Sequence, residues 1–166
     1  MSNYNEKNIF INVIYELLNG ESFNNDLGRI IQLKLLRNTI WQWTGRNGKY
    51  DGCKIWSEKA YNLFKQNDNK KNLNLVHEHI IPIKLLLNEI INLKTKEQIS
   101  LFLDKANGAC ILREEDSILN KNGYRSNMPE NLKDKSILNY TLEDEFARYI
   151  NSGIKLVNTE TEELIF

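Results

Sequence analysis

The pattern of apolar and polar positions predicts a chain built mainly of helices. Apolar residues recur every three or four positions over most of the sequence, which is the period of an amphipathic helix. Ser, Thr and Asp residues stand where several of these patterns begin, and glycines follow three of them, as caps and stop signals do. Helices are expected at about 6–19, from Asp26 through Trp41, from Ser57 through Phe64, at 83–91, at 97–106 after Thr95, at 114–120, and from Thr141 through Ile150.

Three short apolar runs have the length and composition of β-strands. They lie at 73–81, where Pro82 ends the run, at 108–112 and at 154–157. Residues 44–52 contain three glycines and are typical of a loop or hairpin, and 67–74 is a polar linker. The predicted fold class is therefore α+β, mainly helical, with a small β element.

The charge of the chain is zero overall but is distributed unevenly. Its 166 residues include 22 basic and 22 acidic side chains, which excludes a generally basic coating protein for nucleic acids and a polyacidic segment. Residues 29–71 nevertheless carry a net charge of +7, and residues 114–166 carry −5. A locally basic face of this kind can attract phosphate, although solvated helix faces without any ligand would give the same counts.

The cysteine content and the apolar runs of the sequence indicate the cellular compartment in which the protein is expected. Two cysteines, Cys53 and Cys110, are too few for a disulfide scaffold or a four-cysteine zinc site. The first residues lack the pattern of a signal peptide, and no run approaches the roughly 18 apolar residues of a membrane span. We expect a cytoplasmic protein that has no membrane partner, while its oligomeric state and any protein partner stay open.

Candidate chemistry is concentrated in two short segments. The two histidines of the chain stand in LVHEHIIP (75–82), on either side of Glu78. The second segment, NGACILREED (107–116), begins with Asn107 and ends with Asp116, and Asn120 follows one helical turn later on the same face. Histidine is the side chain best suited to act as a base at neutral pH, and carboxylates favour magnesium or manganese.

Together these segments resemble the HNH nucleases, the ββα-metal or His-Me finger superfamily. The resemblance covers about 73–122, under a third of the chain. It implies a metal-dependent endonuclease that hydrolyses phosphodiester bonds of nucleic acid in a bacterial defence, restriction or toxin-like role, with DNA as the default substrate and RNA left open. It also implies a helical N-terminal region (1–72) with the basic segment, a ββα-metal core (73–125) with a helical insertion, and a C-terminal helix and short strand (126–166), packed as one compact domain.

The resemblance assigns roles to five residues in or next to the two segments. His79 is the base that takes a proton from the attacking water, and Asn107 orients it through its backbone or side chain. Glu78 and Asp116 are metal ligands, and Asn120 is an auxiliary ligand. Because the family usually has histidine where Asp116 stands, Mg²⁺ or Mn²⁺ is expected in preference to Zn²⁺.

Basic and aromatic residues outside the two segments are candidates for contacts with nucleic acid. Arg125 is expected either to hold the scissile phosphate or to lie exposed in a turn. Trp41 is expected in the core, and Trp43 either there or stacked on a base. The candidate nucleic-acid contacts are Arg37, Arg46, Lys49 and Lys54.

Two alternatives remain open. On a regular strand His77 and His79 share one face and Glu78 points to the other, which favours a zinc site with His77 as a ligand, or no site at all. The nuclease-like arrangement therefore requires the strand to become irregular at Glu78. The second alternative is a non-catalytic protein-binding module, of the inhibitor or immunity type, that uses its acidic C-terminal half against a basic partner.

Overall fold

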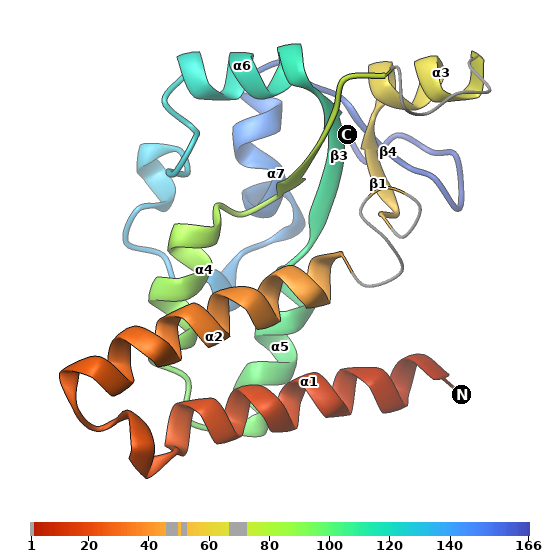
Figure 1. The fold of residues 1–166 in the computed structure, drawn as a ribbon. Coiled ribbons are helices and arrows are strands. Elements are labelled where there is room, and N and C mark those ends of the chain that lie inside the picture. Colours follow the sequence, from red (N-terminus) through yellow and green to blue (C-terminus); the bar gives the residue numbers. More distant parts are fainter. Residues whose placement is uncertain (1, 46–49, 51–52, 67–72) are drawn as a thin grey trace.

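The fold is mainly helical α+β, as the sequence predicts. The computed structural model describes all residues except 1, 46–49, 51–52 and 67–72. Within this described part, seven α-helices accompany one sheet of four short strands (Figure 1). None of the helices formed by these residues has both the length and the apolar character needed to cross a membrane.

The elements follow one another closely along the chain. The helices are α1 (Ser2–Asn19), α2 (Asp26–Thr44), α3 (Glu58–Gln66), α4 (Ile83–Ile90), α5 (Lys96–Lys105), α6 (Arg113–Lys121) and α7 (Leu142–Ile150). The strands are β1 (Ile55–Ser57), β2 (Leu75–His79), β3 (Gly108–Leu112) and β4 (Leu156–Asn158). Short 3₁₀ turns include η1 (Glu21–Phe23), η3 (Glu130–Leu132) and η4 (Ile137–Asn139).

Capping side chains explain where several helices begin. The hydroxyls of Thr95 and Thr141 each accept a hydrogen bond from the backbone three residues later, in capping boxes, as predicted. The Ser57 hydroxyl accepts from the backbone of Ala60 at 3.1 Å and begins α3, also as predicted. The prediction for α2 was wrong by one residue, because Asn25 accepts from the Gly28 backbone at 2.8 Å and is the cap.

The sheet joins segments that are far apart in the sequence. Its strand order is β2-β3-β1-β4. β2 and β3 are antiparallel, β3 and β1 parallel, and β1 and β4 antiparallel. The pattern of the chain did not predict β1, which has only three residues and therefore too few positions to show an alternation. Because β1 comes from 1–72 and β4 from 126–166, the sheet crosses both expected boundaries.

The two faces of the sheet are covered by different helices. One face packs Ala109, Ile111 and Leu156 against α6 and α7, and the other packs Cys110, Leu112 and Trp56 against α3. A separate, larger cluster lies among α1, α2, α4 and α5. Figure 1 shows α1 and α2 side by side as a long helical hairpin, with α5 packed against α1.

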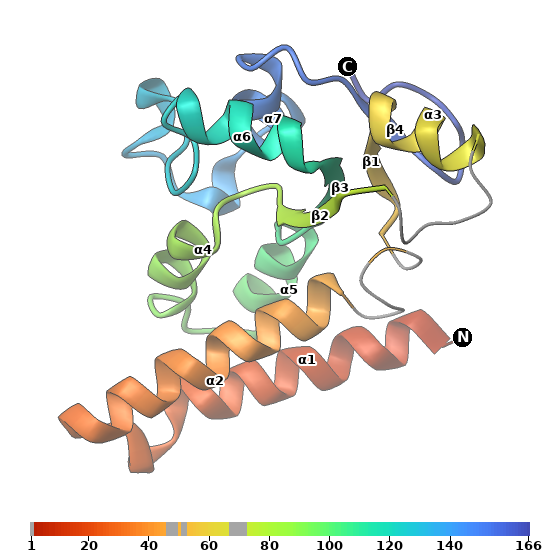
Figure 2. The same ribbon diagram turned by 45° about the horizontal axis from the view of Figure 1, so that its top comes forward.

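β2, β3 and α6 form a compact ββα unit. The two strands pair in register from Leu75 opposite Leu112 to His79 opposite Gly108. α4 and α5 are inserted between them, which confirms that helices occupy the 27 residues between His79 and Asn107. Figure 2 shows α6 above β2 and β3, and α2 on the opposite side of β2. The end of β2 therefore lies between α6 on one side and α2 on the other.

Candidate active site

A cavity of about 300 Å³ lies where β2 ends. We call it the site cavity. Residues from β2, α2, α4, α6 and α7 and from the turn after α6 line it. Its polar lining consists of Glu78, His79, Asp116, Asn120, Arg125 and Arg148. The folded chain thus brings together five of the seven residues that the sequence singled out for catalysis or metal binding, all except His77 and Asn107.

β2 stays regular to its end, so the predicted irregularity at Glu78 was wrong. Burial alternates along the strand, with His77 and His79 on one face and Glu78 on the other. His79 and Glu78 nevertheless both line the site cavity. This is possible because the cavity surrounds the end of the strand, where side chains of both faces can reach it.

His79 is a buried, neutral imidazole held by α2. The residue is only 3% exposed, and its ring lies edge-on against Trp41, with 4.1 Å between ring centroids. Its Nε2 atom is 3.3 Å from the Thr44 hydroxyl. Burial above all, and then the positive charges of His77, Arg148 and Arg37, lower the pKa of His79 to about 3. The ring is therefore uncharged at neutral pH, and its surroundings disfavour the protonated form.

Glu78 and Asp116 bring two carboxyl groups to the site cavity. Burial raises the pKa of Glu78, the Arg148 guanidinium lowers it in part, and the negative charge of Asp116 raises it further. Since Asp116 affects this pKa, the two carboxylates are close enough to repel one another. One turn along α6, the Asn120 amide donates to Asp116 at 3.2 Å, which confirms that these two side chains share a face.

Arg148 fixes the backbone at the end of β2 from inside the protein. It is fully buried and donates to the backbone oxygens of His79, Ile80 and Tyr124. The same guanidinium pairs with the Glu78 carboxylate at 2.8 Å. Because these contacts fix both the carboxylate of Glu78 and the backbone of His79, Arg148 sets their relative position.

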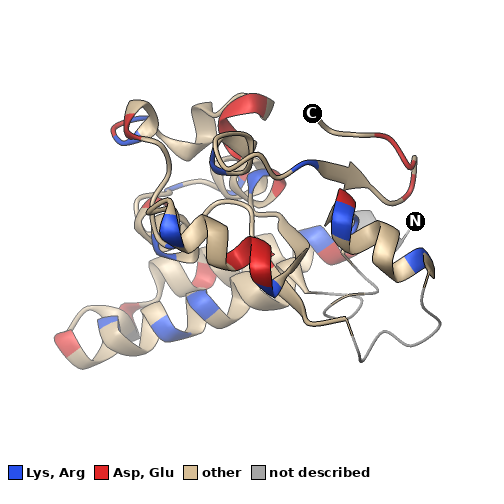
Figure 3. Cartoon of the chain, turned by 90° about the horizontal axis from the view of Figure 1, so that it is seen from above, with Lys and Arg blue, Asp and Glu red and all other residues tan. Residues whose placement is uncertain are grey.

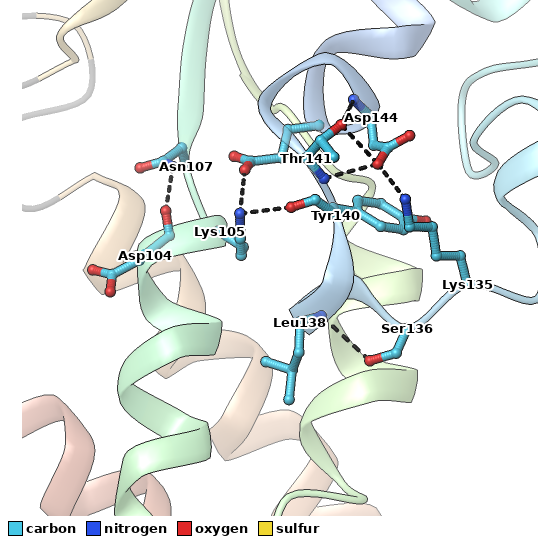
Figure 4. Close-up of polar contacts among 10 residues, drawn as sticks. Asp104, Lys105, Asn107, Lys135, Ser136, Leu138, Tyr140, Thr141 and Asp144 are labelled. Carbon is cyan, nitrogen blue, oxygen red and sulfur yellow. Dashed lines mark hydrogen bonds and ion pairs between the residues drawn. The ribbon is translucent and has the colours of Figure 1, made fainter.

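α7 carries Arg148, and α5 holds α7 in place. The Lys105 ammonium, at the end of α5, donates to the Tyr140 backbone oxygen at 2.8 Å and pairs with Glu145 at 2.7 Å (Figure 4). Burial raises the pKa of Glu145, which the lysine partly opposes. One of the two inserted helices, α5, therefore contacts the helix that carries Arg148.

Asn107 contributes its backbone, and its side chain points elsewhere. The Asn107 amide donates to the Asp104 backbone oxygen at 2.7 Å, at the end of α5 (Figure 4). The Asn107 backbone oxygen accepts from the Ile80 backbone at 2.9 Å. Among the described residues, Asn107 therefore bonds to the backbone of the residue after His79 and not to the imidazole itself.

His77 lies against the sheet and does not line the site cavity. Its Nε2 atom would come within 2.4 Å of a Cβ atom added at Gly108, so glycine is required there for the ring to fit. The rings of His77 and His79 are 6.2 Å apart between centroids. Among the residues that the structure describes, no group of three or more His, Cys, Asp or Glu side chains is arranged to hold a metal ion.

The basic candidates divide between the site cavity and more distant surfaces. Arg125 is exposed and lines the cavity, and Arg37 is close enough to affect the pKa of His79. Figure 3 shows basic residues along α2, the helix that carries Arg37. Lys54 instead pairs with Glu160 at 2.9 Å. Arg46 and Lys49 lie outside the described residues.

Of the two tryptophans of α2, Trp43 lies in the core and Trp41 lies at the site cavity. Trp43 is the core residue, 7% exposed, and its indole donates to the Leu103 backbone oxygen. Trp41 is 36% exposed and lines the site cavity, so its prediction as a core residue was wrong. The apolar pattern of α2 extends around the whole helix and therefore does not identify the buried side.

Sequence reasoning missed Arg148 and Thr44. Arg148 stands one turn after Glu145 and next to Tyr149, on the buried face of α7. That position was a usable signal, because a charge inside an apolar helical face demands a partner. No local signal marks Thr44, which is the last residue of α2 and meets His79 only through the fold.

Comparisons of the chain with protein-family models, with curated proteins and with solved structures give no match.

Proposed function

We propose that the protein is a metal-dependent endonuclease that hydrolyses phosphodiester bonds of nucleic acid, DNA in the first place, and that the site cavity is its active site. The observation that carries the proposal is the meeting of Glu78, His79, Asp116, Asn120 and Arg125 in one cavity. They come from a strand, a helix and a turn, and four of them, Glu78, His79, Asp116 and Asn120, stand at positions of the resemblance to the HNH nucleases, with Asp116 where the family usually has histidine. The defence, restriction or toxin-like role belongs to the same proposal and rests on the resemblance alone.

The donor set of the site cavity fits a hard divalent cation. Glu78 and Asp116 would hold it, with the Asn120 amide oxygen as a further ligand, and repulsion between the carboxylates is relieved by positive charge. Mg²⁺ is commonly bound by one or two carboxylates together with water and substrate phosphate, so a third acidic ligand is not required. Such an ion supplies positive charge to the phosphate and to the leaving oxygen.

The side chains of the chain divide the remaining work. His79 lines the cavity in its unprotonated form and is the proposed acceptor of the proton of an attacking water. The burial that lowers its pKa weakens it as a base, so the negative charge of a bound phosphate would have to favour the proton transfer. Arg125 is exposed at the cavity and can donate to a phosphate oxygen. Arg148 is occupied by three backbone oxygens and by Glu78, and it therefore positions groups rather than binding substrate.

Cleavage of supercoiled plasmid DNA with Mg²⁺ or Mn²⁺ tests the proposal. We expect His79→Ala to lower the cleavage rate by about 100-fold or more, the usual contribution of a general base. Asp116→Asn should also lower the rate and raise the metal concentration needed for cleavage, because it removes a charged ligand. Glu114→Gln is the matched control, because Glu114 is an exposed acid on the same helix outside the site cavity. Metal-dependent cleavage that survives His79→Ala would refute the mechanism.

Two other results would favour the alternatives. A stable protein complex without cleavage of DNA or RNA under any divalent metal would favour a protein-binding module. Bound zinc that is lost when both histidines are replaced by alanine would favour a zinc site.

A further inference from the structure

We infer that Thr44 is the positioning residue of His79, and that it holds the neutral imidazole in the tautomer with its proton on Nε2 and a free electron pair on Nδ1. The inference deepens the proposed function, on which its kinetic part rests. It assigns to α2, outside the ββα unit, the role that the resemblance gives to Asn107. The Asn107 side chain is bonded to the Asp104 backbone oxygen and is not available for that role.

The hydrogen-bond inventory of the Thr44 hydroxyl carries the first step. Its oxygen lies 3.3 Å from the Trp41 backbone oxygen and 3.3 Å from His79 Nε2. A hydroxyl has one proton to donate and two electron pairs that accept. Both contacts can be hydrogen bonds at the same time only if the hydroxyl proton goes to the Trp41 oxygen, because a carbonyl oxygen can only accept. The Thr44 oxygen is then left to accept, and the group facing it on His79 must be Nε2–H.

The surroundings of the other ring nitrogen carry the second step. Within the described part of the chain, Nδ1 of His79 forms no hydrogen bond, and the ring lines the site cavity. A proton on Nδ1 would therefore lack a protein acceptor, whereas a proton on Nε2 has one in Thr44. The electron pair of Nδ1 is then the one that remains free of the protein and available to take up a proton.

The rigidity of the contact carries the third step. Thr44 and Trp41 are separated by less than one turn of α2, and the Trp41 ring packs edge-on against the same imidazole. The Gly45 backbone also donates to the Trp41 oxygen at 3.0 Å and closes the end of the helix. The last turn of α2 therefore fixes the rotation of the His79 ring as well as its proton.

Nitrogen-15 NMR of the imidazoles tests the tautomer without any substrate. The chain contains two histidines, so the spectrum of the labelled protein at pH 7 contains two ring systems. Through-bond correlations to the ring hydrogens identify which nitrogen carries the proton. Nε2–H at His79 is the expected result, and either Nδ1–H or a doubly protonated ring would overturn the inference.

Variants on α2 then test the role of the hydroxyl. Thr44→Val removes the hydroxyl with little change of shape, and we expect the preference for Nε2–H to fall about five- to tenfold, the weight of one neutral hydrogen bond. Thr44→Ser restores the preference. Thr39→Val is the matched control, because the Thr39 hydroxyl also bonds to the backbone of α2, at Leu35, away from the imidazoles.

Kinetics separate this inference from the proposed function. With DNA and Mg²⁺, Thr44→Val should lower kcat about five- to tenfold at unchanged KM, and Thr44→Ser should recover it. A protein with the Nε2–H tautomer but no cleavage would refute the endonuclease and leave the positioning by Thr44 standing. Cleavage that is insensitive to Thr44→Val would refute the positioning and leave the endonuclease standing.

Discussion

Replacing Arg148 by methionine should be among the most destabilising single changes in this protein. Methionine keeps much of the length of the side chain and removes the guanidinium. The arginine is fully buried and is bonded to Glu78 and to the backbone oxygens of His79, Ile80 and Tyr124. The variant therefore leaves a largely buried carboxylate without its counter-charge and three oxygens without that donor.

The structure sets the size of the effect. Removing one partner of a buried ion pair costs about 3–5 kcal/mol. The Glu78 side chain is 24% exposed, so water screens part of its charge, and the lower end, about 3 kcal/mol, is appropriate. Each backbone oxygen that stays without a partner adds about 1–3 kcal/mol, although water in the site cavity can replace some of the lost donors. We expect a total of about 4–6 kcal/mol.

Urea unfolding followed by far-UV circular dichroism measures this loss. Arg125→Met is the matched control, since Arg125 lines the same cavity but is exposed, and its replacement should change the free energy of unfolding by less than about 0.5 kcal/mol. The double variant Arg148→Met/Glu78→Gln should regain about 1–2 kcal/mol, because the unpaired charge is removed. A loss below about 1 kcal/mol for Arg148→Met, or no recovery in the double variant, would refute the reasoning.

Three further predictions concern binding, packing and thiol chemistry. Arg37→Ala should weaken binding of a DNA oligonucleotide about tenfold and reduce the salt dependence of binding by about one ion. Arg29→Ala should have a smaller effect, because Arg29 is also exposed on α2 but lies two turns earlier. Titrations at two salt concentrations measure binding, and equal effects of the two variants would contradict a role for the site cavity. Ser57→Ala should lower the free energy of unfolding, measured by denaturant titration, by about 1–3 kcal/mol. The reason is that the buried Ser57 hydroxyl caps α3 and donates to the buried carboxylate of Glu115 at 2.5 Å. Ser117→Ala removes an exposed hydroxyl and should change the same free energy by less than about 0.5 kcal/mol. Both cysteines are buried, and burial raises the pKa of Cys53 to about 11, so a thiol reagent at pH 8 should label the native protein far more slowly than the protein in urea. Rapid labelling of the native protein would show that the thiol is accessible and would contradict this prediction. The unfolded Cys53 thiol has a pKa near 9 and the folded one a pKa near 11, so the folded state holds the proton more tightly. The free energy of unfolding should therefore fall as the pH rises from 9 to 11, and it should fall less steeply in Cys53→Ala.

The sequence predicted those parts of the site that depend on local spacing. The nine positions from Asn107 to Asp116 span β3 and the first turn of α6, and the pairing of β2 with β3 places this turn beside Glu78. The i,i+4 relation of Asp116 and Asn120 is fixed by helical geometry, and their hydrogen bond confirms it. Such features need no knowledge of how distant segments pack.

The contacts that orient the candidate base could not be predicted in this way. Thr44 and Arg148 reach His79 across 35 and 69 positions of the chain, and neither belongs to a motif. The faces of β2 illustrate the same difficulty. A regular strand correctly places His79 and Glu78 on opposite faces, but only the tertiary structure shows that one cavity at the end of the strand collects both.

The distance in sequence between Arg148 and the end of β2 has a consequence for the newly made chain. A ribosome adds about 5–20 residues per second. The 69 positions between His79 and Arg148 therefore take about 3–14 s to synthesise, and β4, which completes the sheet beside β1, follows Arg148. β3 and α6 are synthesised within that interval, whereas the guanidinium that fixes Glu78 and the backbone of His79 is added only at its end. The order of synthesis thus delays assembly of the site until most of the chain is complete.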